Sequence, residues 1–412
     1  MAQGFSAFRH SAYRRYFTAR FLAAFAVNIL SVAVAWQIYD QTQNPALLGW
    51  IGLVQFAPAL LLVLVTGVAA DRFGRRNIMG LSAMVEAACA GTILTLAVTG
   101  QFDPIYVLGV LTVFGIARAF LSPASAALAV NIVPREDFAN AVGWSASSWQ
   151  LAAIVGPAAG GLLYGVSAQT AYSVSTAALV LSSLLIFAIP KPEQARGGTG
   201  SSLSMVLGGF RYVWKQKVVL GAISLDLFAV LLGGAVALLP VYARDILELG
   251  PMGLGLLRAA PGVGAIAVVT VLAVTPIRDH AGKILFASVA LFGAATVVFG
   301  QSTTVWLSIL ALLCIGGFDM ISVYIREILL QLWTPDDVRG RVNAVNSIFI
   351  GASNELGEAR AGFMAAKWGT VFTVVAGGYA AIGIAGAWAV LFPTMRRTRH
   401  LQGQETGDGL KA

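Results

Sequence analysis

The chain has 412 residues, of which 58% are hydrophobic and only 11% are charged, and its formal net charge is +8. The hydrophobic residues recur in blocks of about 20 or more, which is the length that a helix needs to cross a bilayer core. This composition excludes a water-soluble enzyme, a disordered scaffold and a disulfide-stapled secreted domain. The two cysteines, Cys89 and Cys314, both lie in apolar blocks and provide no disulfide framework.

Twelve apolar segments follow one another along the chain, so the sequence predicts an all-α membrane protein with twelve transmembrane helices. The first segment follows a basic start, as in a signal peptide, but it is too long for one and further spans follow at once. The expected spans are Tyr16–Ile38, Ala46–Ala69, Ile78–Thr99, Ile105–Ile132, Phe138–Tyr164, Ala171–Ile189, Val218–Tyr242, Met252–Ile277, Ile284–Gly300, Thr304–Leu332, Val342–Ala366 and Val371–Phe392.

A polar stretch rich in glycine and serine separates the sixth span from the seventh. It predicts an N-terminal six-helix bundle over residues 1–190, a cytoplasmic linker over 191–217, and a C-terminal six-helix bundle with a cytoplasmic tail over 218–412. The later part of the linker sets Phe210 and Trp214 beside basic residues. This pattern fits either a helix on the membrane surface or a short soluble helix.

Lysine and arginine residues are distributed unevenly between the two sides of the expected membrane. With a cytoplasmic N-terminus, twenty of the 27 basic residues fall on the cytoplasmic side, only Arg244 and Lys367 fall on the other side, and five lie within spans. Cytoplasmic loops of membrane proteins carry such an excess. We therefore expect a multi-pass protein of the cell membrane (inner or plasma) with both termini in the cytoplasm. The positive charge then needs no nucleic-acid partner.

Three features recur at a spacing close to half of the chain length. Arg118 and Arg326 are 208 residues apart, and an Asp-x-x-Gly-basic pattern recurs at the same spacing. An Asn-Ala-Val triplet after a proline also occurs in both halves. One such coincidence is common, but three near one period predict a duplicated six-helix unit. The paired segments are 71–75 with 279–283, and 140–142 with 343–345.

A motif of glycine, aspartate and arginine lies between the second and third spans. Its glycines allow close helix approach and a tight turn, and its charges can pair in one conformational state only. The motif resembles the loop-2/3 signature of the major facilitator superfamily, and the chain resembles that superfamily over nearly its whole length. The resemblance implies a secondary transporter that is a monomer, with this loop as a cytoplasmic gate. The motif comprises Gly67, Asp71, Arg72, Gly74, Arg75 and Arg76.

The fifth span carries a second motif, which is similar to the antiporter motif found mainly in exporters of the superfamily. Glycines and one proline create a face of small side chains for close packing and for a hinge, although Ala152 stands where the motif has a glycine. Softer patterns, such as Arg258–Gly264, resemble the efflux branch that contains the enterobactin exporter. The residues of the motif are Gly143, Gly156, Pro157, Gly160 and Gly161.

Several ionisable residues lie inside the expected spans, where charges are costly and mark cavities or proton paths. A desolvated carboxyl group can exchange a proton, whereas a nearby arginine favours its charged form. Static ion pairs, such as Asp226 with Arg258 or Glu358 with Arg360, are the alternative, and Arg20 and Arg326 are expected to reach the inner interface. For these residues taken as a group, we favour a role in proton coupling. The group comprises Arg118, Asp226, Asp319, Glu86, Glu355 and Glu358.

The sequence lacks the motifs of ATP-driven transport and of hydrolase catalysis. The chain has no phosphate-binding Gly-x-x-x-x-Gly-Lys loop and no nucleophile elbow, and its three histidines all lie near cytoplasmic ends. We therefore expect no catalytic residue, no metal and no cofactor. The expected partners are the lipid bilayer, a small-molecule substrate and protons. The leading hypothesis is a proton-coupled exporter of a small organic molecule, drug- or siderophore-like, that works by alternating access. Proton-coupled uptake and a non-transporting membrane sensor remain as alternatives.

Overall fold

The computed structural model describes residues 5–191 and 202–398, and this part of the chain is helical without strands. Eleven helices within it are long and apolar enough to cross a membrane. The chain is therefore an all-α, multi-pass membrane protein, as predicted. The helix over the eleventh expected span, α13 (Asp336–Trp368), is not among these candidates. It carries Glu355, Glu358 and Arg360 in its second half, which makes it less apolar than the others.

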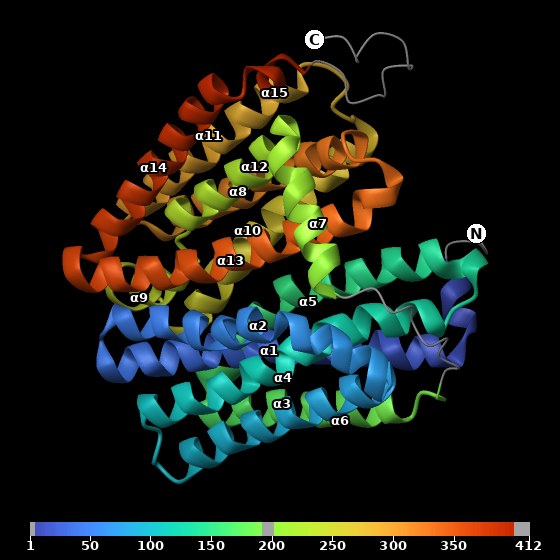
Figure 1. Ribbon diagram of the computed structural model, residues 1–412. Helices are drawn as coiled ribbons and strands as arrows, with labels where there is room; N and C mark the ends of the chain where they lie inside the picture. The colour runs from blue at the N-terminus through green and yellow to red at the C-terminus, as the bar shows by residue number, and fades with distance from the viewer. Residues whose placement is uncertain (1–4, 192–201, 399–412) are drawn as a thin grey trace. The chain divides into compact units, whose positions relative to one another are not determined.

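The residues form two compact units, and the first contains the helices of the first half of the chain together with the segment Ala237–Ala259. Figure 1 shows α1 to α6 running alongside one another. Within this unit α1 packs against α5 and α6, and α4 packs against α2 and α3. Its long helices are α1 (Ser11–Thr42), α2 (Pro45–Phe73), α3 (Arg75–Val98), α4 (Pro104–Asn131), α5 (Phe138–Val166) and α6 (Ala168–Phe187).

The second unit contains Leu203–Val236 and the described residues from Ala260 onward. In this unit α11 packs against both α12 and α14, and α8 packs against α13 and α14. Besides α13, its helices are α7 (Ser202–Lys215), α8 (Lys217–Gly233), the later part of α10 (Gly250–Val274), α11 (Ala281–Gln301), α12 (Val305–Leu332), α14 (Thr370–Leu391) and α15 (Pro393–Arg397).

Short helical turns link the long helices, and local sequence sets several of the helix ends. Asn44 accepts a hydrogen bond from the backbone N–H of Ala46 at 3.0 Å, and a proline follows at the first helical position. Asp103 caps α4 in the same way. The short turns are η1 (Ser6–Arg9), η2 (Arg135–Asp137), η3 (Val236–Leu238), α9 (Leu239–Val241) and the π-helical η4 (Tyr242–Ile246).

The second expected span and the gating loop that follows it need correction. We expected the span to end at Ala69, but α2 continues to Phe73, and Gly74 alone separates it from α3. Gly67, Asp71 and Arg72 therefore lie within the helix rather than in a loop. Residues 70–73 include no proline or glycine, and the helix ends at Gly74, whose φ of +87° is a backbone conformation that L side chains rarely adopt.

The seventh expected span, Val218–Tyr242, is also not one helix. The helix α8 ends at Gly233, and short turns continue the chain to Ile246. Two consecutive glycines, Gly233 and Gly234, stand at the break, where the backbone has little helical preference. The chain after the break belongs to the first unit, although α8 belongs to the second.

Helix α7, in the expected linker, is docked on the second unit by one face. Val213 is buried in a small hydrophobic cluster, and the hydroxyl of Tyr212 donates a hydrogen bond to the carbonyl of Trp333 at 2.7 Å. Trp214, on the other face, is exposed. The helix is therefore part of the second unit. The buried members of the cluster are Val213, Val219, Ile223, Leu330, Val342 and Val345.

Candidate functional site

The second unit buries a cluster of charged side chains between α8 and α12. Arg326 Nη1 lies 2.8 Å from Asp226 Oδ2, and the two side chains are only 5% and 9% exposed. Asp319 lies seven residues before Arg326 on α12, a separation of two helical turns that places both on one face. Asp226, Asp319 and Ser322 line a small cavity of about 10 Å³, roughly the space of one water molecule.

This triad of Asp226, Asp319 and Arg326 has an unbalanced charge. Two carboxyl groups face one guanidinium, so the cluster carries one excess negative charge unless one carboxyl group holds a proton. Burying such a charge without compensation is costly. A proton on one of the two carboxyl groups would remove the excess charge.

The ion pair differs from the one that the sequence suggested. We considered Arg258 as the partner of Asp226, but Arg258 Nη1 donates to Ser31 Oγ at 2.7 Å in the first unit. Arg326, expected at the inner interface, is instead buried against Asp226. The sequence did contain a signal for the role of Arg326, because this residue lies one repeat length from Arg118 and two helical turns from Asp319. Hydropathy alone does not tell which helices face each other.

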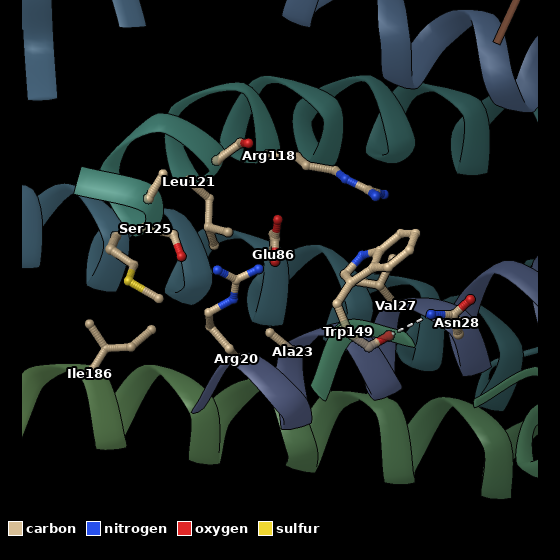
Figure 2. A pocket seen from close by; sticks show the side chains of 14 residues that line it. Arg20, Ala23, Val27, Asn28, Glu86, Arg118, Leu121, Ser125, Trp149 and Ile186 are labelled. Atoms are coloured by element: carbon tan, nitrogen blue, oxygen red, sulfur yellow. Dashed lines mark hydrogen bonds between the residues drawn. The ribbon is translucent and has the colours of Figure 1, made fainter. Parts of the chain in front are cut away.

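The first unit contains a pocket of about 250 Å³ that is lined from α1, α3, α4, α5 and α6. Three ionisable residues line it: Arg20 on α1, Glu86 on α3 and Arg118 on α4. Figure 2 shows the Glu86 side chain between those of Arg20 and Arg118 in this view. Glu86 is only 2% exposed, and its side chain lines the pocket.

The remaining wall of this pocket is mostly apolar. Arg20 donates a hydrogen bond to the Tyr16 hydroxyl at 3.1 Å, which anchors its side chain. The Asn28 amide donates to the Ala24 carbonyl at 2.8 Å, the dashed line in Figure 2. Arg20 was expected at the inner interface, so the sequence missed its place in the pocket. The other lining residues are Ala23, Val27, Met79, Leu121, Ser122, Ser125, Ala126, Trp149 and Ile186, together with Ala24.

The other embedded carboxyl groups lie apart from these two sites. Glu355 and Glu358 are half-buried on α13 and line neither cavity. The neighbouring Arg360 donates to the Met364 sulfur at 3.2 Å. Residues 5–191 and 202–398 contain no group of three or more His, Cys, Asp or Glu side chains that is arranged to hold a metal ion.

The arginines of the gating motif fasten the start of α3. Arg75 Nη1 donates to Asn131 Oδ1 at 3.2 Å, and Arg76 Nη1 donates to the Ile189 carbonyl at 3.0 Å. The second half of the motif is thereby tied to the ends of α4 and α6. The surroundings of Gly67 and the side chains of Asp71 and Arg72 lie outside the described part of the structure.

The small-residue face of α5 packs against two helices. A Cβ atom on Gly156 would lie 2.6 Å from the Cβ of Asn28, and one on Gly160 would lie 3.0 Å from the Cα of Ile29, both on α1. A Cβ on Gly161 would lie 2.5 Å from the Pro251 carbonyl oxygen, at the start of α10. Gly143 has open space around it. Pro157 lies inside the helix, and Gly255 packs against its carbonyl oxygen.

A polar cluster closes the C-terminal end of α1. Arg244 Nε lies 2.7 Å from Asp40 Oδ1, and Arg244 Nη1 lies 3.1 Å from Asp245 Oδ1. The hydroxyl of Tyr39 donates to Asp245 Oδ2. Arg244 was one of the two basic residues assigned to the non-cytoplasmic side. The cluster holds the segment after α8 within the first unit.

Replacing Arg244 with glutamine is expected to lower the free energy of unfolding by about 1 kcal/mol or less, because exposed ion pairs contribute little. The side chains of Arg244 and Asp40 are 28% and 49% exposed. The measurement is the midpoint of heat-induced loss of the monodisperse peak in size-exclusion chromatography. A shift as large as that from breaking the buried Asp226–Arg326 pair would contradict this ranking.

A bundle of membrane-crossing helices that buries charged residues around cavities is typical of membrane transporters. The model of the family described as transmembrane secretion effector matches residues 2–404. The chain therefore belongs to this family of the major facilitator superfamily, which confirms the resemblance found in the sequence. It is a transporter for small molecules and not an enzyme.

Similar proteins support the same assignment. The enterobactin exporter EntS of Shigella boydii serotype 4 (strain Sb227) is 25% identical, and the alignment covers 96% of this chain and 95% of that protein. EntS of Escherichia coli (strain SMS-3-5) has the same identity and coverage.

Solved transporter structures share the fold. A bacterial homologue of the human lysosomal transporter Spinster, inward-facing and unoccupied, has a TM-score of 0.73 at 12% identity and covers 94% of this chain and 99% of that one. A POT family transporter in complex with 5-aminolevulinic acid has a TM-score of 0.74 at 10% identity, with 94% and 97% coverage. At these identities the similarity concerns the fold alone.

Proposed function

We propose that this transporter exports a small organic molecule, siderophore- or drug-like, in exchange for protons and by alternating access. The observation that carries the proposal is the triad of Asp226, Asp319 and Arg326 in the second unit. Ionisable groups at such depth in membrane helices are costly and are found in proton relays. The similarity to proteins named enterobactin exporter supports outward transport and a siderophore-like substrate.

In this mechanism Arg326 holds Asp226 by a direct ion pair, and Asp319 is the group that gains and loses the proton. Proton uptake removes the excess negative charge of the triad and so changes which conformation is favoured. A proton drives transport only if it binds the two conformations with different affinity. Arg118 and Glu86 are the corresponding embedded charges of the first unit, and Glu355 and Glu358 are further candidates for proton exchange.

We also propose that the transporter consists of two six-helix repeats, with α13 as the eleventh span and α14 as the twelfth. The packing partners support this, because the pairs α1–α5, α1–α6, α3–α4 and α3–α6 have counterparts in α8–α13, α8–α14, α11–α12 and α11–α14. The same correspondence relates Arg118 on α4 to Arg326 on α12. The distribution of basic residues supports an inner-membrane location of a monomer with both termini and the linker in the cytoplasm. The gating motif then lies on the cytoplasmic side.

The decisive experiment is the accumulation of a fluorescent drug or siderophore in cells that lack the gene. We expect the deletion strain to accumulate more of the compound, and re-expression to lower the level again. An uncoupler that collapses the proton gradient should remove the difference. Lower accumulation in the deletion strain would indicate uptake instead, and an unchanged level for every compound in the panel would indicate a sensor.

A further inference from the structure

We propose that the pocket of the first unit binds an organic anion that carries a single aromatic ring. The inference rests on the proposed export function and deepens it, because it assigns a charge and a size to one part of the substrate. The carrying observation is the juxtaposition of Arg20, Arg118 and Glu86 with Trp149 around one cavity (Figure 2).

The charge of the pocket favours an anion in either protonation state of Glu86. Arginine side chains are permanently protonated, so Arg20 and Arg118 supply two positive charges. Glu86 supplies at most one negative charge, and none of the other lining residues is ionisable. The net charge is therefore +1 or +2. This positive charge attracts an anionic ligand and repels a cationic one.

Arg118 has the donors that such a ligand needs. Among the described residues it makes no hydrogen bond and no ion pair within 4.0 Å, although it lies near enough to Glu86 to interact with it through space. The planar guanidinium of arginine can donate two parallel hydrogen bonds to one carboxylate. Arg20 is partly occupied, because it donates to the Tyr16 hydroxyl. Arg118 is therefore the primary anchor and Arg20 a second positive charge.

The size and the walls of the pocket favour one ring. A cavity of about 150 Å³ in a protein core holds benzene, and drug-sized ligands need about 300 Å³ or more. The pocket, at about 250 Å³, accommodates one ring with its acidic group. Trp149 is 53% exposed and offers a ring face for stacking, and Leu121 and Ile186 supply an apolar wall. A larger substrate would place only one arm here.

The test measures binding of three ligands of equal ring size and different charge to the purified full-length protein in nanodiscs. The ligands are benzoate, benzamide and benzylamine, and the method is equilibrium dialysis with radiolabelled compounds. We expect benzoate to bind about 10- to 100-fold more tightly than benzamide, since a hydrogen bond to a charged group has that effect. Benzylamine should bind most weakly.

Three variants assign the binding to the pocket. Arg118→Gln should weaken benzoate binding about 10- to 100-fold and leave benzamide binding nearly unchanged. Glu86→Gln should bind benzoate at least as tightly as the wild type, because the substitution can only remove negative charge from the pocket. The matched control is Arg244→Gln, because Arg244 lies in the same unit but outside the pocket. This variant should bind benzoate like the wild type.

Several results would overturn the proposal. Equal binding of benzoate and benzamide by the wild type would do so without any variant, as would a preference for benzylamine. Unchanged benzoate affinity in Arg118→Gln would show that the anion binds elsewhere, and weaker benzoate binding by Glu86→Gln would contradict the charge argument. If Arg118→Gln does not fold, Arg118→Lys takes its place. Lysine keeps the charge but loses the two-fold hydrogen bond, so its benzoate affinity should fall below that of the wild type while its benzamide affinity stays unchanged.

The binding test and the accumulation test fail independently. Charge-selective binding by a protein that exports nothing from cells would leave the anion site intact and remove the proposed function. Export that shows no dependence on the charge of the compound, with no charge-selective binding, would do the reverse.

Discussion

Replacing Asp226 with asparagine is expected to abolish proton-driven export and to lower the free energy of unfolding by about 3–5 kcal/mol. The substitution leaves the Arg326 guanidinium, only 5% exposed, without its ion-pair partner. A buried charge that has lost its partner is far more costly than the pair it came from. Transport is measured in everted membrane vesicles, and stability by heated size-exclusion chromatography.

Asp319→Asn is the matched control, because it removes a carboxyl group from the same cavity but leaves the Asp226–Arg326 ion pair in place. We expect it to abolish transport with little loss of stability. The double variant Asp226→Asn/Arg326→Gln should regain stability relative to Asp226→Asn, since both charges are gone, but it should not regain transport. Full transport by Asp226→Asn and Asp319→Asn would contradict proton coupling by this triad.

Replacing Gly161 with leucine is expected to destroy the packing of α5 against the start of α10 and with it both stability and transport. Even the first side-chain carbon would lie 2.5 Å from the Pro251 carbonyl oxygen and 2.9 Å from the Gly255 Cα. These are backbone atoms, which cannot rotate away as a side chain can. Overpacking costs about 1–3 kcal/mol in a soluble core, and a whole leucine side chain should reach or exceed that range.

The control for this substitution is Gly143→Leu on the same helix, where a new side chain meets nothing within 4 Å. We expect wild-type expression and a stability that is unchanged or slightly increased, because leucine favours helix formation more than glycine does. Heated size-exclusion chromatography compares the two variants directly. Similar behaviour of both would mean that the close approach at Gly161 does not stabilise the bundle.

The helix pattern was predictable, but some boundaries were not. The apolar segments predicted where helices lie, because a membrane span needs about 20 apolar residues regardless of its neighbours. Hydropathy did not reveal that α8 ends at Gly233, since an apolar run continues through the break. It also ended the second span too early, because the polar residues before Gly74 remain helical.

The candidate site was predictable in its residue types and not in its pairings. The sequence placed Asp226, Asp319 and Arg118 among the embedded charges, because charges in apolar blocks are conspicuous. It suggested Arg258 as the partner of Asp226, and it placed Arg326 at the interface. It did not assign Arg20 to a pocket. In each case the missing information was which side of a helix faces which neighbour.

The sequence by itself determined that this protein is a membrane transporter, through its hydropathy, its basic residues and the motif around Gly74. These properties depend on local composition and spacing. The tertiary structure decided that Arg326 pairs with Asp226, that Arg20, Glu86 and Arg118 share a pocket, and that Gly161 touches backbone. Such contacts join residues far apart in the chain, and they depend on how each helix is rotated and shifted against the next. No local pattern in the sequence specifies those rotations.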